Sequence, residues 1–336
     1  MQSYGNSAPR RPFDSATPSR DLLRPFDVPQ ELFPVQHRFL ELDCARIHYV
    51  DEGAGESLLL LHGNPSWCFL YRKIIAALRS DFRCVALDFP GYGLSDAPAG
   101  YGFTPKEHSY VLEHFVERLG LKDLTMMVQD WGGPIGLGFG GRRPELVRRL
   151  IIANTFAWPL DGEPRIRIFS WVMGGPIGRL LTSTFNFVPK FFFTRGLAQR
   201  PAPEVLEMYL APWRNPARRT AAVIAPRQLV AASPYLREVA GNLPKLADRP
   251  VLFVWGTKDF AFREAERQRF ERIFSKHKTV LFDDASHFLQ EDVGYRISES
   301  IRAFRSEVTD RVLIIHHPKI LVTCATGTTG RHTVPF

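Results

Sequence analysis

The sequence predicts an α/β fold in which helices flank both faces of a mostly parallel, eight-stranded sheet. The first observation is that short continuous apolar runs, typical of strands buried on both faces, alternate with helical segments. The second is an ordinary globular composition, with 45% hydrophobic and 23% charged residues in a chain of 336. The third is a middle segment that breaks the alternation, which predicts an inserted helical cap.

The elements follow in order along the chain. Residues 38–50 alternate apolar and polar side chains, as antiparallel strands do, and residues 51–55 form a turn. Buried strands are expected at 58–61, 84–87, 124–128, 150–153, 251–255 and 279–282. Helices are expected at 70–78, 106–119, 134–142, 264–274 and 293–308.

This reading divides the chain into regions. Residues 35–155 and 236–308 are expected to form the core. Residues 156–235, rich in proline and aromatic side chains, are expected to form the cap. Residues 1–34 carry six prolines and are expected to form an N-terminal arm.

Charge and cysteine usage exclude several functions. The net charge of +8 comes largely from residues 156–235, which hold ten Lys/Arg and four Asp/Glu scattered among aromatics and prolines. Because no nucleic-acid-binding motif accompanies them, we expect no nucleic-acid partner. No stretch approaches the roughly 20 apolar residues of a membrane span, so we expect no membrane partner and a cytoplasmic protein. The four cysteines form no C-x-x-C pair, which argues against a metal site.

Polar side chains follow four of the expected strands. Asn64 follows the strand at 58–61, Asp130 the strand at 124–128, Asp259 the strand at 251–255 and His287 the strand at 279–282. In an open parallel sheet, such strand exits meet at one edge. Two acids and a histidine are therefore expected to converge.

Asp130 occupies the position of a nucleophile at a sharp strand-to-helix turn, which Gly132 and Gly133 allow to close tightly. A carboxylate there needs no base and can attack a saturated carbon to form an ester. His287 is expected to activate water as a general base, and Asp259 to orient the imidazole. The alternative is that Asp130 only caps a helix and His287 only packs, but the conjunction of four strand exits favours catalysis.

Three segments carry a family resemblance: HGNPSW at 62–67, DFPGYGLSD at 88–96 and VQDWGGP at 128–134. They resemble the α/β-hydrolase superfamily and, within it, the haloalkane dehalogenases, over about residues 39–304. The resemblance implies that the Asn64 and Trp131 side chains donate hydrogen bonds to the halogen and the departing halide. It also implies that their backbone N–H groups form the oxyanion hole and that no cofactor is needed. The expected partners are a small apolar halogenated substrate and the halide product, and a homo-oligomer is compatible with the sequence.

The acid of the triad requires a choice. One branch of the family uses a Glu after the sixth strand, where this chain has Asn154, so we assign the role to Asp259. Asp283 and Asp284 precede His287 on the same loop and are ranked below Asp259 as the triad acid. An Asp-His-Asp triad with an Asn-Trp pair is most similar to the third subfamily of these dehalogenases.

The cap is expected to supply the apolar walls of the substrate pocket. The predicted pocket residues are Phe156, Trp158, Phe169 and Trp171, with Phe191 and Phe192 as further candidates.

Other functions remain in competition. An epoxide hydrolase would use the same triad with tyrosines of the cap, and Tyr209 and Tyr235 are available. However, the epoxide hydrolases that resemble this chain have an aromatic residue at the position of Asn64 and a histidine at the position of Gln129. The sequence separates a luciferase-like monooxygenase only poorly from a dehalogenase. Asp130 in place of Ser excludes a serine esterase, and the intact triad argues against a non-enzymatic binding protein.

The C-terminal residues 309–336 are atypical. Residues 319–331 are similar to the opening strand and glycine loop of NAD(P)-binding proteins. Because only six residues follow Gly330, no βαβ unit can form, and we expect a remnant and no cofactor site.

Overall fold

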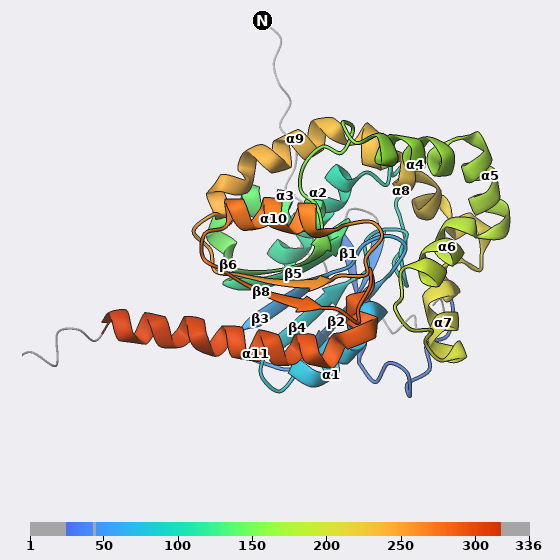
Figure 1. The fold of residues 1–336 in the computed structure, drawn as a ribbon. Coiled ribbons are helices and arrows are strands. Elements are labelled where there is room, and N and C mark those ends of the chain that lie inside the picture. Colours follow the sequence, from blue (N-terminus) through green and yellow to red (C-terminus); the bar gives the residue numbers. More distant parts are fainter. Residues whose placement is uncertain (1–24, 43–44, 317–336) are drawn as a thin grey trace, which may run out of the picture.

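Eight strands form one sheet in the computed structural model, which describes residues 25–42 and 45–316, with side chains to residue 307. The strands are β1 (His37–Leu42), β2 (Ala45–Glu52), β3 (Ser57–Leu61), β4 (Arg83–Leu87), β5 (Leu124–Asp130), β6 (Val147–Thr155), β7 (Val251–Gly256) and β8 (His277–Phe282). Their order is β1-β2-β4-β3-β5-β6-β7-β8 (Figure 1). β2 pairs antiparallel with β1 and β4, and all later pairs are parallel. The predicted fold class is confirmed.

The helices cover both faces of this sheet. They are α1 (Arg72–Leu78), α2 (Pro105–Arg118), α3 (Gly132–Arg142), α4 (Pro164–Gly174), α5 (Pro176–Phe185), α6 (Phe187–Arg195), α7 (Pro203–Leu210), α8 (Thr220–Ala231), α9 (Ser233–Asn242), α10 (Glu264–Ile273) and α11 (Leu289–His316). Short 3-10 helices lie at Cys68–Tyr71, Pro144–Leu146, Ala211–Trp213, Pro216–Arg218 and Leu243–Leu246. α1 and α11 lie on one face and α2, α3, α9 and α10 on the other (Figure 1).

Local sequence explains where helices begin. Thr104 accepts a hydrogen bond from the Glu107 backbone, Glu107 bonds back to the Thr104 N–H, and Pro105 occupies the first turn of α2. α4, α5 and α7 likewise begin with a proline, whose missing N–H costs nothing in a first turn. The proline-rich middle of the chain is therefore helical.

Burial divides the core into two layers. β5 is buried along its whole length, as its apolar run predicts. Leu112, Phe139 and Phe270 pack on one face of the sheet, and Ile75 and Leu289 pack on the other. Both layers are continuous hydrophobic clusters, which fixes the sheet firmly beneath the strand exits.

Helices α4 to α8 form the inserted region between β6 and α9, which stands over one edge of the sheet (Figure 1). The predicted end of the cap at residue 235 lies inside α9, whose Tyr235 hydroxyl donates to the Pro134 carbonyl of α3 at 2.9 Å. The last helix was expected at 293–308, whereas α11 begins at Leu289 and continues to His316, with non-helical torsions at Val293.

The described part of the predicted arm is packed on the core. Phe33 is fully buried, with its ring 5.5 Å from that of Phe69, and Phe26 lies edge-on to Trp67. Residues 1–24 and the glycine-rich segment 319–331 lie outside the described residues.

Candidate active site

Asp130 ends β5 at a turn held from several sides. Its backbone has a φ of +50°, in the left-handed region that residues other than glycine rarely adopt. The Thr155 hydroxyl donates to the Asp130 carbonyl. A Cβ on Gly132 would lie 2.3 Å from the Leu61 carbonyl, and one on Gly133 would lie 1.8 Å from the Thr155 hydroxyl. This close packing fixes the direction of the Asp130 side chain.

The two carboxylate oxygens of Asp130 have different surroundings. Oδ1 accepts the Asn64 backbone N–H at 2.7 Å, and the Trp131 backbone N–H also bonds to the carboxylate. Oδ2 lies 3.6 Å from His287 Nε2. A Cβ on Gly63 would lie 2.2 Å from Oδ1, so glycine is required there. One oxygen therefore accepts the Asn64 amide, and the other faces the histidine.

His287 connects Asp130 to Asp259. Its Nδ1 lies 3.0 Å from Asp259 Oδ2, and both side chains are buried. This contact puts the proton on Nδ1 and leaves the Nε2 lone pair directed to the side of Asp130. Asn154 Nδ2 donates to the same Asp259 oxygen at 2.9 Å, and Asn154 Oδ1 accepts the Gly256 N–H at 2.7 Å. Asn154 thus holds the acid in position, a contact that the sequence analysis missed.

Gln129 is a second residue whose position the sequence analysis missed. It is fully buried, and its Nε2 donates to the His287 carbonyl at 3.0 Å and lies 3.3 Å from His287 Nε2. Its place directly before Asp130, at the carboxyl end of β5, was the available signal, because the carboxyl ends of parallel strands meet at one edge of the sheet.

Burial and charge act against each other on the ionisable groups. Burial raises the pKa of Asp130, against the opposing charge of His287 and the two amide hydrogen bonds. Burial would lower the pKa of His287, but the carboxylates of Asp259 and Asp130 outweigh it and raise this pKa. Ionisable groups with shifted pKa values that share one cleft are typical of catalytic sites.

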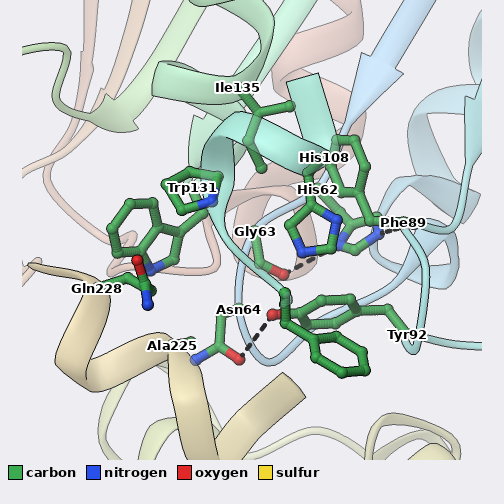
Figure 2. A pocket seen from close by; sticks show the side chains of 12 residues that line it. His62, Gly63, Asn64, Phe89, Tyr92, His108, Trp131, Ile135, Ala225 and Gln228 are labelled. Carbon is green, nitrogen blue, oxygen red and sulfur yellow. Dashed lines mark hydrogen bonds between the residues drawn. The ribbon is translucent and has the colours of Figure 1, made fainter. Parts of the chain in front are cut away.

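The Asn64 amide is held by Tyr92. The Tyr92 hydroxyl donates to Asn64 Oδ1 at 3.3 Å, which leaves the amide nitrogen on the opposite side of the group (Figure 2). Tyr92 and Asn64 are both buried. A void of about 10 Å³ lies among His62, Tyr92, Trp131 and their neighbours, which is about the space of one water molecule.

A cavity of about 200 Å³ opens directly over Asp130. Asn64 and Trp131 lie at its base with Asp130. Its walls are mostly apolar and come from the cap and from the loop after β7: Ile166, Phe169, Phe192, Pro226, Leu229, Phe260, Ala261 and Phe262, with Arg165 and Arg263. Phe169, one of the predicted pocket residues, is among these lining residues. The loop residues were missed because they follow Asp259 without any motif.

Three of the predicted pocket residues lie elsewhere. Trp171 is 78% exposed and lines an outer groove of the cap, because α4 turns its Phe169 side inward and its Trp171 side outward. Trp158 packs under Arg269 and against the ring of Phe270. Phe156 is fully buried behind the wall, against Trp131 and Phe262. Of the further candidates, Phe192 lines the cavity, and Phe191 packs behind it.

The cap tyrosines required by an epoxide hydrolase are absent from the cavity lining. Tyr209 is fully buried and donates to Glu291 at 2.5 Å, and Tyr235 bonds to Pro134 on α3. Neither hydroxyl faces a substrate bound over Asp130, which weighs against that alternative.

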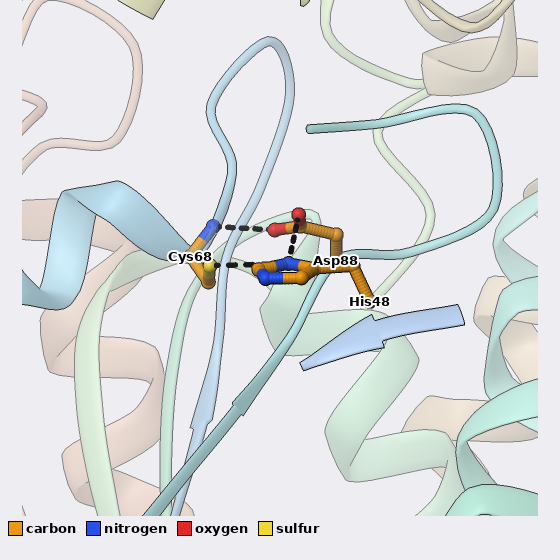
Figure 3. A group of neighbouring side chains, drawn as sticks. All are labelled: His48, Cys68 and Asp88. Carbon is orange, nitrogen blue, oxygen red and sulfur yellow. Dashed lines mark hydrogen bonds and ion pairs between the residues drawn. The ribbon is translucent and has the colours of Figure 1, made fainter. Parts of the chain in front are cut away.

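A second polar cluster joins His48, Cys68 and Asp88 (Figure 3). Asp88 Oδ2 accepts from His48 Nδ1 at 2.7 Å and the Leu94 N–H at 2.9 Å, while Oδ1 accepts the Cys68 N–H at 2.8 Å. Burial and the Asp88 charge raise the pKa of the Cys68 thiol well above its usual range. Because these donors already satisfy the carboxylate, and a metal would need the thiolate, the cluster fits a structural network that anchors the loop of Tyr92.

Comparison with known proteins agrees with this geometry. Residues 56–292 match the family model of the α/β hydrolase fold. The chain is 41% identical over 278 residues to "Haloalkane dehalogenase 2" of Mycobacterium tuberculosis, covering 82% of this chain and 97% of that one. This chain belongs to the haloalkane dehalogenases of the α/β-hydrolase family.

This dehalogenase also has relatives with another name. It is 32% identical over 290 residues to "Cis-3-alkyl-4-alkyloxetan-2-one decarboxylase" of Shewanella oneidensis, covering 82% of this chain and 90% of that one. The crystal structure of the haloalkane dehalogenase DatA from Agrobacterium tumefaciens superposes with a TM-score of 0.74 at 24% identity, over 82% of this chain and 97% of that one, which supports the fold. Among the described helices, none combines the length and apolarity needed to cross a membrane.

Proposed function

We propose that this dehalogenase converts a haloalkane and water to an alcohol, a halide ion and a proton through an ester on Asp130, with the triad and halide-binding pair of the third subfamily. The observation that carries the proposal is the unequal environment of the two Asp130 oxygens. Oδ1 accepts the Asn64 backbone N–H, whereas Oδ2 faces His287 Nε2 at 3.6 Å beneath a mostly apolar cavity.

The first step is displacement of the halide. Asp130 Oδ2 attacks the carbon that bears the halogen, and the carbon–halogen bond breaks with both electrons leaving on the halide. The Trp131 indole and the Asn64 amide, oriented by Tyr92, donate to the developing negative charge. Such donors in a water-poor pocket contribute about 3 kcal/mol each to lowering the barrier.

The second step is hydrolysis of the ester. His287 Nε2 takes a proton from water, and the oxygen of that water attacks Cγ of Asp130. The negative charge then develops on Oδ1, which accepts the Asn64 backbone N–H, and the Trp131 backbone N–H donates to the same carboxylate. Asp259 stabilises the imidazolium, which gives its proton to the departing alkoxide and so forms the alcohol. The carboxylic acid left on Asp130 then releases the proton of the overall reaction and becomes a carboxylate again.

A single-turnover experiment tests this assignment. With n-butyl bromide, the wild type should release bromide continuously, and Asp130→Ala should release none. His287→Ala should release one equivalent and gain the mass of a butyl group on the peptide that contains Asp130. Asp283→Asn, which changes a nearby exposed carboxylate, is the matched control and should behave as the wild type. Continuous turnover by His287→Ala would show that another group activates the water.

A second candidate function is decarboxylation of a cis-3,4-dialkyl-oxetan-2-one, the substrate in the name of the Shewanella relative. Asp130 would attack the ring carbon bonded to the ring oxygen, and the leaving group would be a carboxylate. Loss of carbon dioxide would then expel Asp130 and form an alkene. The specific observation in favour is that Arg165, which also pairs with Glu266, and Arg263 line the mostly apolar cavity, where a carboxylate could bind beside them.

The two functions differ in their need for water. The β-lactone route consumes no water, so His287→Ala should still turn over repeatedly and release carbon dioxide. The haloalkane route stops after one equivalent in the same variant. Measuring halide from a bromoalkane beside carbon dioxide from a dialkyl β-lactone therefore separates them.

A further inference from the structure

The outer side of the cap exposes large apolar side chains. Trp171 is 78% exposed, Ile177 75%, Ile168 and Leu180 63%, and Phe185 62%. These five residues lie on the consecutive helices α4 and α5 or at the end of α5, and we call this surface the α4–α5 face. Figure 1 shows both helices at the outer edge of the cap, away from the sheet. Large exposed apolar patches mark interaction sites, whereas scattered single residues do not.

The same face is strongly basic. Helices α4 and α5 contain Arg165, Arg167 and Arg179 and no Asp or Glu. Arg167, Arg179 and Arg227 surround a groove beside Trp171, and all three are exposed. Within the described part of the chain, none of these three arginines forms an ion pair with an acidic side chain, whereas Arg165 pairs with Glu266.

We propose that the α4–α5 face docks on an anionic lipid surface, with Trp171 and its apolar neighbours in the interface and the three arginines at the phosphate groups. An apolar face with Trp, Leu and Phe, bordered by Lys and Arg, is the pattern of surface-bound helices. Each basic residue near an anionic membrane strengthens binding, and the guanidinium group suits phosphate. The helices lie on the bilayer and do not cross it.

Other occupants fit the charge less well. A second copy would place Arg167, Arg179 and Arg227 opposite the same three residues, since a two-fold interface brings the same surface together. The chain segments outside the described residues are also basic: residues 1–24 hold four Arg and two Asp, and residues 317–336 hold one Lys, one Arg and no acid. Only an anionic partner with an apolar interior matches both the charge and the exposed side chains.

The face adjoins the cavity over Asp130. α4 contributes Arg165, Ile166 and Phe169 to the cavity lining, while Ile168 and Trp171 of the same helix point outward. Docking would therefore bring the cavity wall close to the lipid, where apolar molecules concentrate. The sequence alone predicted no membrane partner because it showed no spanning segment, and it could not show which side of α4 is exposed.

Vesicle flotation of the full chain tests the proposal. The wild type should float with vesicles of phosphatidylcholine and phosphatidylglycerol in equal amounts and remain behind with phosphatidylcholine alone. Arg167→Gln, Arg179→Gln and Arg227→Gln together should weaken binding to the mixed vesicles about a hundredfold. Trp171→Ser with Ile177→Ser should weaken it about tenfold or more.

Matched variants control for general loss of charge or apolar surface. Arg118→Gln with Lys122→Gln changes exposed cations at the end of α2, and Tyr295→Ser changes an exposed aromatic of α11. These controls should bind as the wild type does, and all variants should keep its melting temperature and its activity on a water-soluble substrate.

Several results would overturn the proposal. The wild type could fail to float with the mixed vesicles, or the controls could lose as much binding as the variants of the face. Phosphate binding without vesicle binding would assign the arginines to a free anion. A dimer that dissociates in Trp171→Ser would assign the face to a second copy.

Discussion

Glu291 is the centre of an ion-pair network whose removal should destabilise the protein measurably. Arg72 donates to both of its carboxylate oxygens, at 2.5 and 2.9 Å, and the Tyr209 hydroxyl donates at 2.5 Å. Lys73 lies 2.9 Å from the same carboxylate. The network joins α1 and α11 of the core to α7 of the cap, so Glu291→Gln disturbs the contact between them.

The magnitude follows from the pKa of Glu291. Although burial opposes the charged form, hydrogen bonds and charge from Arg72 lower the pKa of the carboxyl from 4.5 to about 2. At about 1.4 kcal/mol per pH unit, this difference corresponds to about 3 kcal/mol of folding free energy. Because the folded pKa lies below the unfolded one, the stabilisation is complete above pH 4.5 and is lost as the pH falls toward 2.

Urea denaturation of the wild type and Glu291→Gln at several pH values measures this contribution. The variant should lose about 3 kcal/mol at neutral pH, and the gap should shrink by about half near the midpoint of the two pKa values. Glu207→Gln, which breaks the exposed pair with Arg214, is the control and should cost about 1 kcal/mol or less. A gap below about 1 kcal/mol, or one independent of pH, would refute the reasoning.

Three further predictions concern the site. Tyr92→Phe removes one neutral hydrogen bond of about 1 kcal/mol, so bromide should bind about fivefold more weakly, as measured by quenching of Trp131 fluorescence. Asp259→Asn should leave the release of the first equivalent of halide unchanged but slow ester hydrolysis about a thousandfold or more. Because Asp259 raises the pKa of His287, the pH profile of the residual rate should move to lower pH. Phe192→Ala enlarges the cavity wall and should shift kcat/KM about tenfold in favour of longer bromoalkanes over n-butyl bromide, in a competition assay.

The core was predictable because its signals are local. Each buried strand is a continuous apolar run, and the side chain that follows a run must lie at the carboxyl edge of the sheet. Asn64, Asp130 and His287 could therefore be expected to meet from their positions in the sequence alone. The structure brings them together, with Asp259 bonded to His287.

The cap was less predictable because the sequence of its helices does not show which side of each helix faces the cavity. Phe169 and Trp171 are two residues apart on α4, so one turns to the cavity and the other to solvent, and the even hydrophobicity of the helix does not say which. The roles of Asn154 and Gln129 at the site were not predicted for another reason. Their importance lies in hydrogen bonds to Asp259 and His287, and an amide in a strand carries no motif for such a contact.

The glycines beneath Asp130 have a consequence for directed evolution of this enzyme. At Gly63, Gly132 and Gly133 even one added methyl group would collide with the nucleophile or its support, so libraries that randomise these positions should return almost only the parent. The opposite wall, built by Phe169 and Phe192, belongs to helices that carry none of the reacting groups. Selection for new substrates should therefore yield substitutions at Phe169 and Phe192 but none at the three glycines.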